Sequence, residues 1–274
     1  MADLDFFSDA DFENYKKLIY KESGIVFTMG NRSILEGRLR ERLRQNKAPS
    51  VGEYYKTIIA NSGELTAFID SITTNLTSFF RNLPHFTALE KYIIPEISAV
   101  RSEKADKTLR VWSAGCSTGE EAYTIAMLLS EKLPPPWTFD IVASDISLKC
   151  LMTGKEGFYA ADRIVGIPDT YLAKYFEKHE GGYKVKDSLK SKIRFDYHNL
   201  INLSPWRNFD VVFCRNVLIY FDEVMQTQVI NHFWNNMLNK SFLFIGHSES
   251  LFGLNTKFDF VKTQWTTLYK KWVS

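Results

Sequence analysis

The sequence has few cysteines and almost no net charge. Its 274 residues include three widely spaced cysteines, Cys116, Cys150 and Cys214, which form neither a disulfide framework nor a metal motif. The five histidines also lack metal-ligand spacing, so we expect no metal. A formal charge of +2 is too small to indicate nucleic-acid binding by itself, and reduced thiols favour a cytoplasmic protein.

Long apolar runs are also missing. No run approaches the roughly 20 residues that cross a membrane. The acidic start MADLDFFSDADF lacks the basic residues and the apolar core of a secretory signal. We therefore expect a cytoplasmic protein without direct membrane insertion. An apolar content of 45% and a charged content of 24% are ordinary for a globular protein and argue against a disordered or fibrous chain.

The first part of the chain has helical periodicity. Apolar residues recur every three or four positions in four segments between about residues 12 and 72. The residues expected to separate these segments are Gly24, Pro49, Gly52 and Gly63. The polar run TTNLTSFFRN ends the pattern, and a further helix is expected from about Pro84 to Ala99. The pattern predicts an all-helical N-terminal domain at residues 1–80.

From Leu109 onward, apolar strands alternate with helices. This alternation predicts an α/β fold, with a doubly wound, mostly parallel sheet in a second domain at residues 81–274. The closing segment FDFVKTQWTTLYKKW contains two β-rich runs without a helix between them, which predicts a terminal antiparallel hairpin. The alternation is lost around residues 157–195, where GGYKVKDSLKSKIRF predicts a small β-insertion with a hairpin.

The stretch from Leu109 to Asp145 predicts a site for a nucleoside-containing cofactor. The apolar run LRVWSAG opens into the turn CSTGEE, and a second run, FDIVASD, ends on a carboxylate that suits ribose hydroxyls. The spacing of Gly115 and Gly119 does not make the G-x-G-x-x-G pattern of a diphosphate site. The turn therefore argues against a nicotinamide dinucleotide.

Two acids at this turn favour a cationic cofactor. Glu120 and Glu121 would repel a diphosphate and attract the sulfonium and ammonium groups of S-adenosylmethionine. Both acids could instead only cap a helix, and the turn alone leaves the two interpretations even. The pairing with Asp145 favours S-adenosylmethionine, and hence a sheet of the type found in methyltransferases that use it.

Two other polar groups are candidates for the same site. Arg215 and Asn216 directly follow the apolar strand FDVVFC, at the sheet edge where ligands of open α/β sheets bind. Tyr220 follows them closely. The segment TTNLTSFFR, from Thr73 to Arg81, combines hydroxyls, an amide and a guanidinium, although alone it is more typical of a helix start.

Five segments in order resemble one family. TTNLTSFFR, VWSAGCSTGEEAY, ASDIS, FCRNVLIYF and GHSES together resemble the chemotaxis receptor methyltransferases, the CheR family, and the resemblance covers nearly the whole chain. It implies methyl transfer from S-adenosylmethionine, leaving S-adenosylhomocysteine, to glutamate side chains of bacterial chemoreceptors in chemotactic adaptation. The implied partner is the cytoplasmic helical bundle of such a receptor, and the implied enzyme is a monomer that binds no nucleic acid.

The resemblance also implies site residues. Arg81 and Tyr220 would line the methyl-transfer centre. The implied cofactor contacts are Asn75, Thr77, Arg81, Glu121, Asp145, Asn199, Leu200, Arg215 and Asn216. A glutamate is already ionised near neutral pH, so the acceptor needs no general base and positioning becomes the main catalytic contribution. Phe79, Phe80 and Tyr220 are expected to line a pocket of low polarity that favours the transition state, in which the charges cancel.

A basic helix in the N-terminal domain is a candidate docking surface. Leu35, Leu39 and Leu43 recur every four positions and are expected to be buried, which leaves the arginines exposed. Such a charge run is usually a solvated face, yet acidic receptor helices would dock on it. The arginines assigned to docking are Arg38, Arg40, Arg42 and Arg44.

One segment of the β-insertion bears on how the enzyme would reach its receptor. EKHEGGYKVK is shorter than the loop of relatives that tether to a receptor pentapeptide, so we expect a pentapeptide-independent enzyme.

Two other functions are compatible with the predicted fold. A nucleic-acid methyltransferase would use the same sheet and a basic helix, but the motifs for base amines and for a cytosine nucleophile are missing. A non-catalytic receptor-binding module of the same fold is the other alternative.

Overall fold

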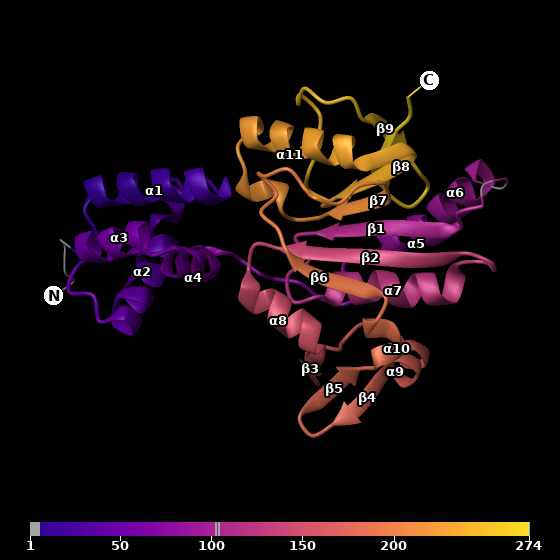
Figure 1. The fold of residues 1–274 in the computed structure, drawn as a ribbon, viewed down its shortest axis with the longest axis horizontal. Helices are drawn as coiled ribbons and strands as arrows, with labels where there is room; N and C mark the ends of the chain where they lie inside the picture. Colours follow the sequence, from indigo (N-terminus) through magenta and orange to yellow (C-terminus); the bar gives the residue numbers. More distant parts are fainter. Residues whose placement is uncertain (1–5, 102, 104, 274) are drawn as a thin grey trace. The chain divides into compact units, whose positions relative to one another are not determined.

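The computed structural model describes residues 6–101, 103 and 105–273 (Figure 1). The chain divides into two compact units. The first ends at Thr74 and also includes Tyr220–Met225, while the second contains Asn75–Ile219 and the chain from Gln226 onward. Among the described residues, no helix has both the length and the apolar character needed to cross a membrane.

The first unit is all helical, as predicted. Its elements before Thr74 are α1 (Asp9–Ser23), η1 (Met29–Asn31), α2 (Arg32–Asn46), α3 (Val51–Ala60) and α4 (Ser62–Ile72). Helix α1 is capped at its start by Ser8, whose hydroxyl accepts a hydrogen bond from the Asp11 amide, and at its end by Gly24 in the left-handed conformation. We expected Gly52 and Gly63 to separate helices, but they lie in the first turns of α3 and α4.

Aromatic rings fill the core of the first unit. Tyr15 and Tyr54 meet the ring of Phe68 edge to face, at centroid distances of 5.6 and 6.1 Å. The predicted stripe of Leu35, Leu39 and Leu43 on α2 is buried. The hydrophobic periodicity of α2 therefore predicted its buried face correctly.

The second unit contains a seven-stranded sheet, which confirms the predicted fold class. Its strands are β1 (Thr108–Ala114), β2 (Thr138–Asp145), β6 (Ile193–Tyr197), β7 (Phe209–Cys214), β8 (Met237–Ile245), β9 (Asp259–Lys262) and β10 (Thr267–Lys271). Their order is β6-β2-β1-β7-β8-β10-β9. The first five strands in this order are parallel, and β9 and β10 form the predicted antiparallel hairpin. The order reverses beside β1, so the crevice between the carboxyl ends of β1 and β7 is the expected ligand site.

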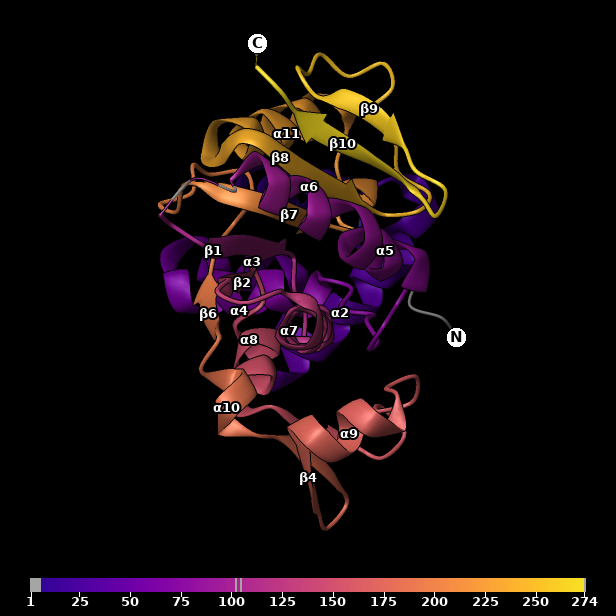
Figure 2. The ribbon, with the colours of Figure 1, turned by 90° about the vertical axis from the view of Figure 1, so that its right-hand side faces the viewer.

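Helices cover both faces of this sheet. They are α5 (Leu83–Ala88), η2 (Leu89–Ile93), α6 (Ile94–Val100), α7 (Glu120–Lys132), α8 (Leu148–Glu156) and α11 (Glu223–Asn236). On one face, Phe86 of α5 stacks on Phe213 of β7, and Figure 2 shows α5 and α6 lying over β7 and β8. On the other face, Trp112 of β1 meets Phe233 of α11. This two-sided cover buries the central strands.

The helix expected from Pro84 to Ala99 contains a widened turn. Residues Leu89–Ile93 are π-helical, and the Ile94 amide donates to the Leu89 carbonyl oxygen, five residues earlier. Pro95 follows at the start of α6. Because proline has no N–H and its ring collides with the carbonyl four residues earlier, a regular α-helix cannot pass through this position without adjustment.

A small three-stranded antiparallel sheet is inserted between α8 and β6. Its strands are β3 (Phe158–Ala160), β4 (Phe176–His179) and β5 (Gly182–Val185), accompanied by α9 (Asp169–Tyr175) and α10 (Asp187–Lys190). Figures 1 and 2 show it apart from the large sheet. Strands β4 and β5 are joined by the two residues Glu180 and Gly181. Ile193–Phe195, which we had placed in the insertion, instead belongs to β6, because it pairs in parallel with β2.

A buried ion pair joins α6 to the start of β7. The guanidinium of Arg101 contacts the carboxylate of Asp210, and their side chains are only 7% and 1% exposed. Arg101 Nη1 also donates to the Thr108 carbonyl oxygen at 3.1 Å, and Asp210 accepts from the Arg110 amide at 2.8 Å. Removal of the arginine would leave an uncompensated buried carboxylate.

We predict that Arg101→Met lowers the free energy of unfolding of the second unit by about 3–5 kcal/mol, because the Asp210 charge loses its partner. Urea denaturation followed by tryptophan fluorescence measures this loss, since all six tryptophans lie in the second unit. Lys257→Met, at an exposed position, is the matched control. A loss below about 1 kcal/mol for Arg101→Met would contradict the prediction.

Candidate functional site

The loops that follow β1 and β7 meet at the switch point of the sheet. Gly115 begins the first loop with a φ of 84°, a left-handed conformation that favours glycine. A Cβ atom on Gly115 would lie 2.5 Å from Cγ2 of Val217 in the second loop. The absence of a side chain at Gly115 therefore allows the two loops to approach each other.

Helix α7 begins with two buried acids that already have partners. Glu121 accepts a hydrogen bond from Ser113 Oγ at 2.6 Å and pairs with Arg215 Nε at 2.6 Å. Glu120 pairs with Arg163 of the insertion. We expected these acids to attract a cationic ligand, and each is also paired with an arginine far away in the sequence. The two ion pairs therefore tie the start of α7 to the end of β7 and to the insertion.

Arg215 connects three segments of the site. Its side chain is only 3% exposed, and Nη1 donates to the Arg81 carbonyl oxygen at 2.6 Å as well as pairing with Glu121 through Nε. Nη1 also lies 3.1 Å from Nδ1 of His85, and the guanidinium lies 5.1 Å from the centre of the Phe86 ring. Among the described residues, none accepts from Nη2, which leaves donors for a ligand.

His85 is a neutral partner of this arginine. Burial, together with the charges of Arg215 and His247, lowers the pKa of His85 to about 4. An unprotonated Nδ1 can accept a hydrogen bond from Arg215 Nη1, so the ring carries its proton on Nε2. Sequence reasoning did not place His85 in the site, because its partner Arg215 lies 130 residues away.

Asp145, at the end of β2, organises the turns around it. One carboxylate oxygen accepts from the Ser117 amide at 2.7 Å and the other from the Ser147 amide at 2.9 Å. Ser147 in turn caps α8 through the Cys150 amide. The carboxylate is therefore held in a fixed orientation at the carboxyl edge of the sheet.

The segment from Asn75 to Arg81 is fastened to the loop after β1 and to α7. The Asn75 carbonyl oxygen accepts from Ser117 Oγ at 3.0 Å, and the Phe80 amide donates to Thr124 Oγ1 at 3.1 Å. Arg81 Nη1 donates to the Leu76 carbonyl oxygen at 2.7 Å. These contacts bring Asn75, the half-buried Thr77 and Arg81 to the same edge of the sheet as Asp145 and Arg215.

The two phenylalanines of this segment are packing residues. Phe79 is buried against Tyr159 and Phe176 of the insertion, with ring centroids at 5.0 and 5.7 Å. Phe80 packs against Phe86 and Tyr171. We expected both rings to line a pocket for the reacting groups, but their contacts instead anchor the segment to the hydrophobic core.

Asn216 carries a buried polar atom that the described part of the chain leaves without a partner. Its side-chain oxygen Oδ1 receives no hydrogen bond from the described residues, and its backbone is left-handed, with a φ of 60°. A buried acceptor of this kind fits a ligand that brings a donor, as the ammonium group of S-adenosylmethionine does. Asn199 and Leu200, in the loop after β6, are also nearly buried.

Sequence reasoning missed Glu249, although it lies in the quoted segment GHSES. Its carboxylate accepts from the amides of Asn216 and Ile219, at 3.0 and 3.2 Å, and from the amide of Gly246. An acid shortly after the apolar end of β8 was the available signal. Tyr220, by contrast, was predicted; it ends the short helix η3 (Leu218–Tyr220) and is half-buried.

The basic helix α2 divides into free and engaged arginines. Arg38 and Arg44 are exposed and form no ion pair with the described residues, whereas Arg40 pairs with Glu36 at 2.9 Å. Arg42 is held by Glu64 and by the Tyr54 hydroxyl, and its side chain is only 16% exposed. Arg42 therefore stabilises the helical unit itself.

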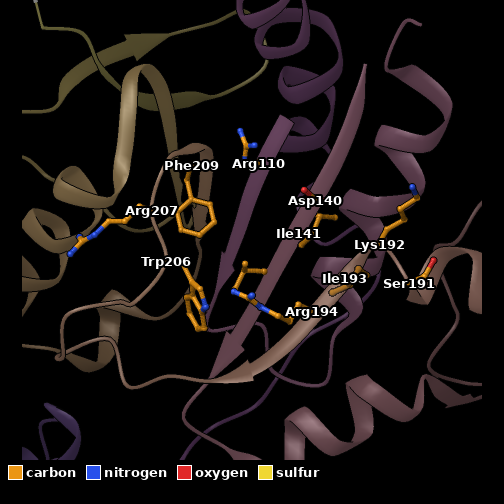
Figure 3. A pocket seen from close by; sticks show the side chains of 11 residues that line it. Arg110, Asp140, Ile141, Ser191, Lys192, Ile193, Arg194, Trp206, Arg207 and Phe209 are labelled. Atoms are coloured by element: carbon orange, nitrogen blue, oxygen red, sulfur yellow. The ribbon is translucent and has the colours of Figure 1, made fainter. Parts of the chain in front are cut away.

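A hollow of about 400 Å³ lies at the opposite end of the large sheet. It is lined by the first residues of β6 and β7, by Arg110 and by the stretch Asp140–Val142. Figure 3 shows Arg207 and Lys192 pointing away from each other and Arg194 directed toward Trp206. The charged groups do not converge, and none of the predicted site residues lines the hollow.

Comparison with known proteins identifies the family. The model of the CheR methyltransferase S-adenosylmethionine-binding domain matches residues 75–267, and that of the CheR all-alpha domain matches residues 10–73. The chain belongs to the CheR methyltransferase family. The predicted family and cofactor are thus confirmed, and the protein is a methyltransferase that uses S-adenosylmethionine.

Curated bacterial relatives match over most of their length. The chain is 36% identical over 245 residues to the chemotaxis protein methyltransferase of Borreliella burgdorferi, covering 86% of this chain and 87% of that one. It is 36% identical over 260 residues to that of Escherichia coli, covering 92% and 88%. Chemotaxis protein methyltransferase 2 of Vibrio cholerae is 32% identical over 272 residues, covering 96% and 93%. These relatives support a role in chemotaxis.

We predict that His85 makes this protein less stable in acid. Below about pH 6.5 an unfolded histidine gains a proton, whereas the folded His85 remains neutral down to about pH 4. The free energy of unfolding should therefore fall through this window, by about 3 kcal/mol from His85 alone. His85→Gln, which cannot titrate, should lose correspondingly less between pH 7 and pH 4.5.

Urea denaturation at several pH values, followed by tryptophan fluorescence, measures this difference. His179→Gln, at an exposed position of β4, is the matched control for the loss of a histidine. Parallel pH profiles for wild type and His85→Gln would show that His85 is not the neutral, buried group described above.

Proposed function

We propose that this methyltransferase methylates glutamate side chains on the cytoplasmic helical bundle of a chemoreceptor, as a monomer in the bacterial cytoplasm. The observation that carries the proposal is the assembly around Arg215, which brings the Arg81 segment, the start of α7 and the Asn216 turn to the switch point of a CheR-family sheet. The curated relatives are named chemotaxis protein methyltransferases, and this name supports a chemoreceptor as the substrate.

Bound S-adenosylmethionine would supply an activated methyl group, and the residues of the site would hold and orient it. We assign Asp145 to the ribose hydroxyls, because its carboxylate lies at the carboxyl end of β2. The buried Oδ1 of Asn216 would accept from the ammonium group, and Nη2 of Arg215 would donate to the carboxylate. Asn75, Thr77, Glu121, Asn199 and Leu200 complete the proposed cofactor contacts.

The acceptor glutamate needs orientation more than activation. Its carboxylate is ionised near neutral pH, so no base is required to generate the nucleophile. The Arg81 guanidinium or the Tyr220 hydroxyl would hold one carboxylate oxygen while the other is aligned behind the methyl group. Alignment of the reacting atoms is then the main source of rate acceleration.

The proposed docking surface for the receptor is the exposed face of α2. Arg38 and Arg44 are exposed outside the stripe of buried leucines, and their charges are free to meet an acidic receptor helix. Arg40 is shared with Glu36, and Arg42 is engaged by Glu64, so Arg38 and Arg44 are the main candidates.

The chemical nature of the product tests the function directly. We predict that purified protein transfers labelled methyl groups from S-adenosylmethionine to a chemoreceptor cytoplasmic fragment from the same organism. Mild base should release the label as methanol, because a glutamyl methyl ester is hydrolysed readily. A fragment in which the acceptor glutamates are replaced by alanine is the control. Base-stable label would point to nitrogen or carbon methylation and would contradict the proposal.

Charge reversal tests the docking surface. We predict that Arg38→Glu together with Arg44→Glu raises the KM for the receptor fragment about tenfold, or about 1.4 kcal/mol, and leaves cofactor affinity unchanged. Lys17→Glu with Lys21→Glu, on α1 of the same unit, is the matched control. An equal rise in KM for both pairs would indicate only a general charge effect and would argue against docking on α2.

A further inference from the structure

Glu249 joins the ends of two neighbouring strands. Its Oε2 accepts from the amide of Asn216, just after β7, at 3.0 Å, and from the amide of Gly246, just after β8. Its Oε1 accepts from the amide of Ile219 at 3.2 Å. One side chain therefore satisfies backbone donors at both ends of the turn from Asn216 to Ile219.

The turn held by this carboxylate has an unfavourable backbone conformation. Asn216 has a φ of 60°, a left-handed conformation that residues with a side chain adopt uncommonly, although asparagine tolerates it better than most. A hydrogen bond from its amide to an ionised acceptor is of the stronger kind and can favour this conformation. Glu249 therefore stabilises the conformation that directs the Asn216 side chain.

Gly246, after β8, lies close to both Glu249 and the Asn216 amide after β7. A Cβ atom on Gly246 would lie 2.6 Å from Oε2 of Glu249 and 2.8 Å from the Asn216 nitrogen. Glycine at this position allows the carboxylate to reach both amides. A side chain at residue 246 would therefore crowd both the carboxylate of Glu249 and the backbone amide of Asn216.

The charge of Glu249 is balanced by backbone dipoles. The part of the chain that the structure describes places no lysine, arginine or histidine in an ion pair with it. Burial raises the pKa of the Glu249 carboxyl, while the amides of Gly246, Asn216 and Ile219 favour its ionised form. A carboxylate surrounded by amides in this way fixes backbone geometry more than it forms a charge pair.

We infer that Glu249 is a positioning residue that holds the Asn216–Ile219 turn and so aims Asn216 Oδ1 at the cofactor. The inference deepens the proposed function, since it rests on the assignment of Asn216 to the cofactor site. It does not depend on the identity of the methyl acceptor. The effect of Glu249 on the cofactor must then pass through Asn216.

A double-mutant cycle on the affinity for S-adenosylhomocysteine, measured by titration calorimetry, tests this dependence. We predict that Glu249→Gln raises the Kd about tenfold, because the amide group cannot accept from all three backbone donors. In an Asn216→Ala background the same change should raise the Kd less than about twofold, since the side chain to be aimed is gone. Equal effects in both backgrounds, or no effect of Glu249→Gln, would overturn the inference.

A second variant keeps the Glu249 carboxylate and disturbs its contact with Asn216 from the other side. Gly246→Ala should crowd both the carboxylate and the Asn216 amide, and so raise the Kd as Glu249→Gln does. Glu180→Gln, in the exposed turn between β4 and β5, should leave it unchanged. Unfolding curves identify variants that are folded at the assay temperature, and only those enter the comparison. An unchanged Kd for a folded Gly246→Ala would likewise overturn the inference.

Binding of the product also distinguishes this inference from the proposed function. No receptor takes part in the calorimetric measurement, so a wrong receptor substrate leaves the cycle unaffected. An Asn216→Ala protein with wild-type affinity would remove Asn216 from the cofactor site and overturn the inference, while the test for a base-labile methyl ester would stand.

Discussion

The contact between Arg215 and Glu121 is the constraint on which the rest of the site depends. Their side chains are almost completely buried, so removal of either charge would leave the other without compensation. The same arginine binds the Arg81 backbone and a neutral His85. Three segments of the chain are thereby fixed relative to one another before any ligand arrives, which is the condition that catalysis by alignment requires.

Pairing of the acids changes how the site can recognise a cationic cofactor. With Glu120 and Glu121 paired to Arg163 and Arg215, the proposed recognition relies on individual oriented acceptors such as Asp145 and Asn216 Oδ1. The Arg163 contact also ties the insertion to the turn before α7, as does the hydrogen bond from the Tyr159 hydroxyl to the Thr118 carbonyl oxygen at 2.6 Å. The insertion is therefore part of the scaffold of the proposed site.

Local patterns predicted the elements of this fold, and distant contacts explain what they could not predict. The leucine stripe of α2 and the strand pattern after Leu109 follow from residue spacing, and the structure agrees with both. The ion-pair partners of Arg42 and Arg215 cannot be predicted from residue spacing, because Glu64 and Glu121 lie 22 and 94 residues away. Hydrophobic periodicity carries no information on such pairs.

The candidate site could be predicted in position but not in detail. Strand ends rich in polar residues indicated the edge of the sheet where Asp145, Arg215 and Asn216 lie. Which atoms are already occupied was not predictable, since Phe79 and Phe80 resemble pocket residues in the sequence and pack into the core. Glu249 accepts hydrogen bonds from backbone amides. Its role could not be predicted, because a sequence does not show in which direction the backbone N–H groups point.

The contact between Gly115 and Val217 has a consequence for how this sequence can evolve. The 2.5 Å separation that a Cβ atom would have from Val217, together with the left-handed backbone of Gly115, means that residue 115 cannot gain a side chain while Val217 keeps its size. Loss of bulk at residue 217 would make room for a methyl group at residue 115 but would not remove the backbone strain. We therefore expect substitutions at the outer residues of the two loops to be tolerated more readily than substitutions that enlarge residue 115.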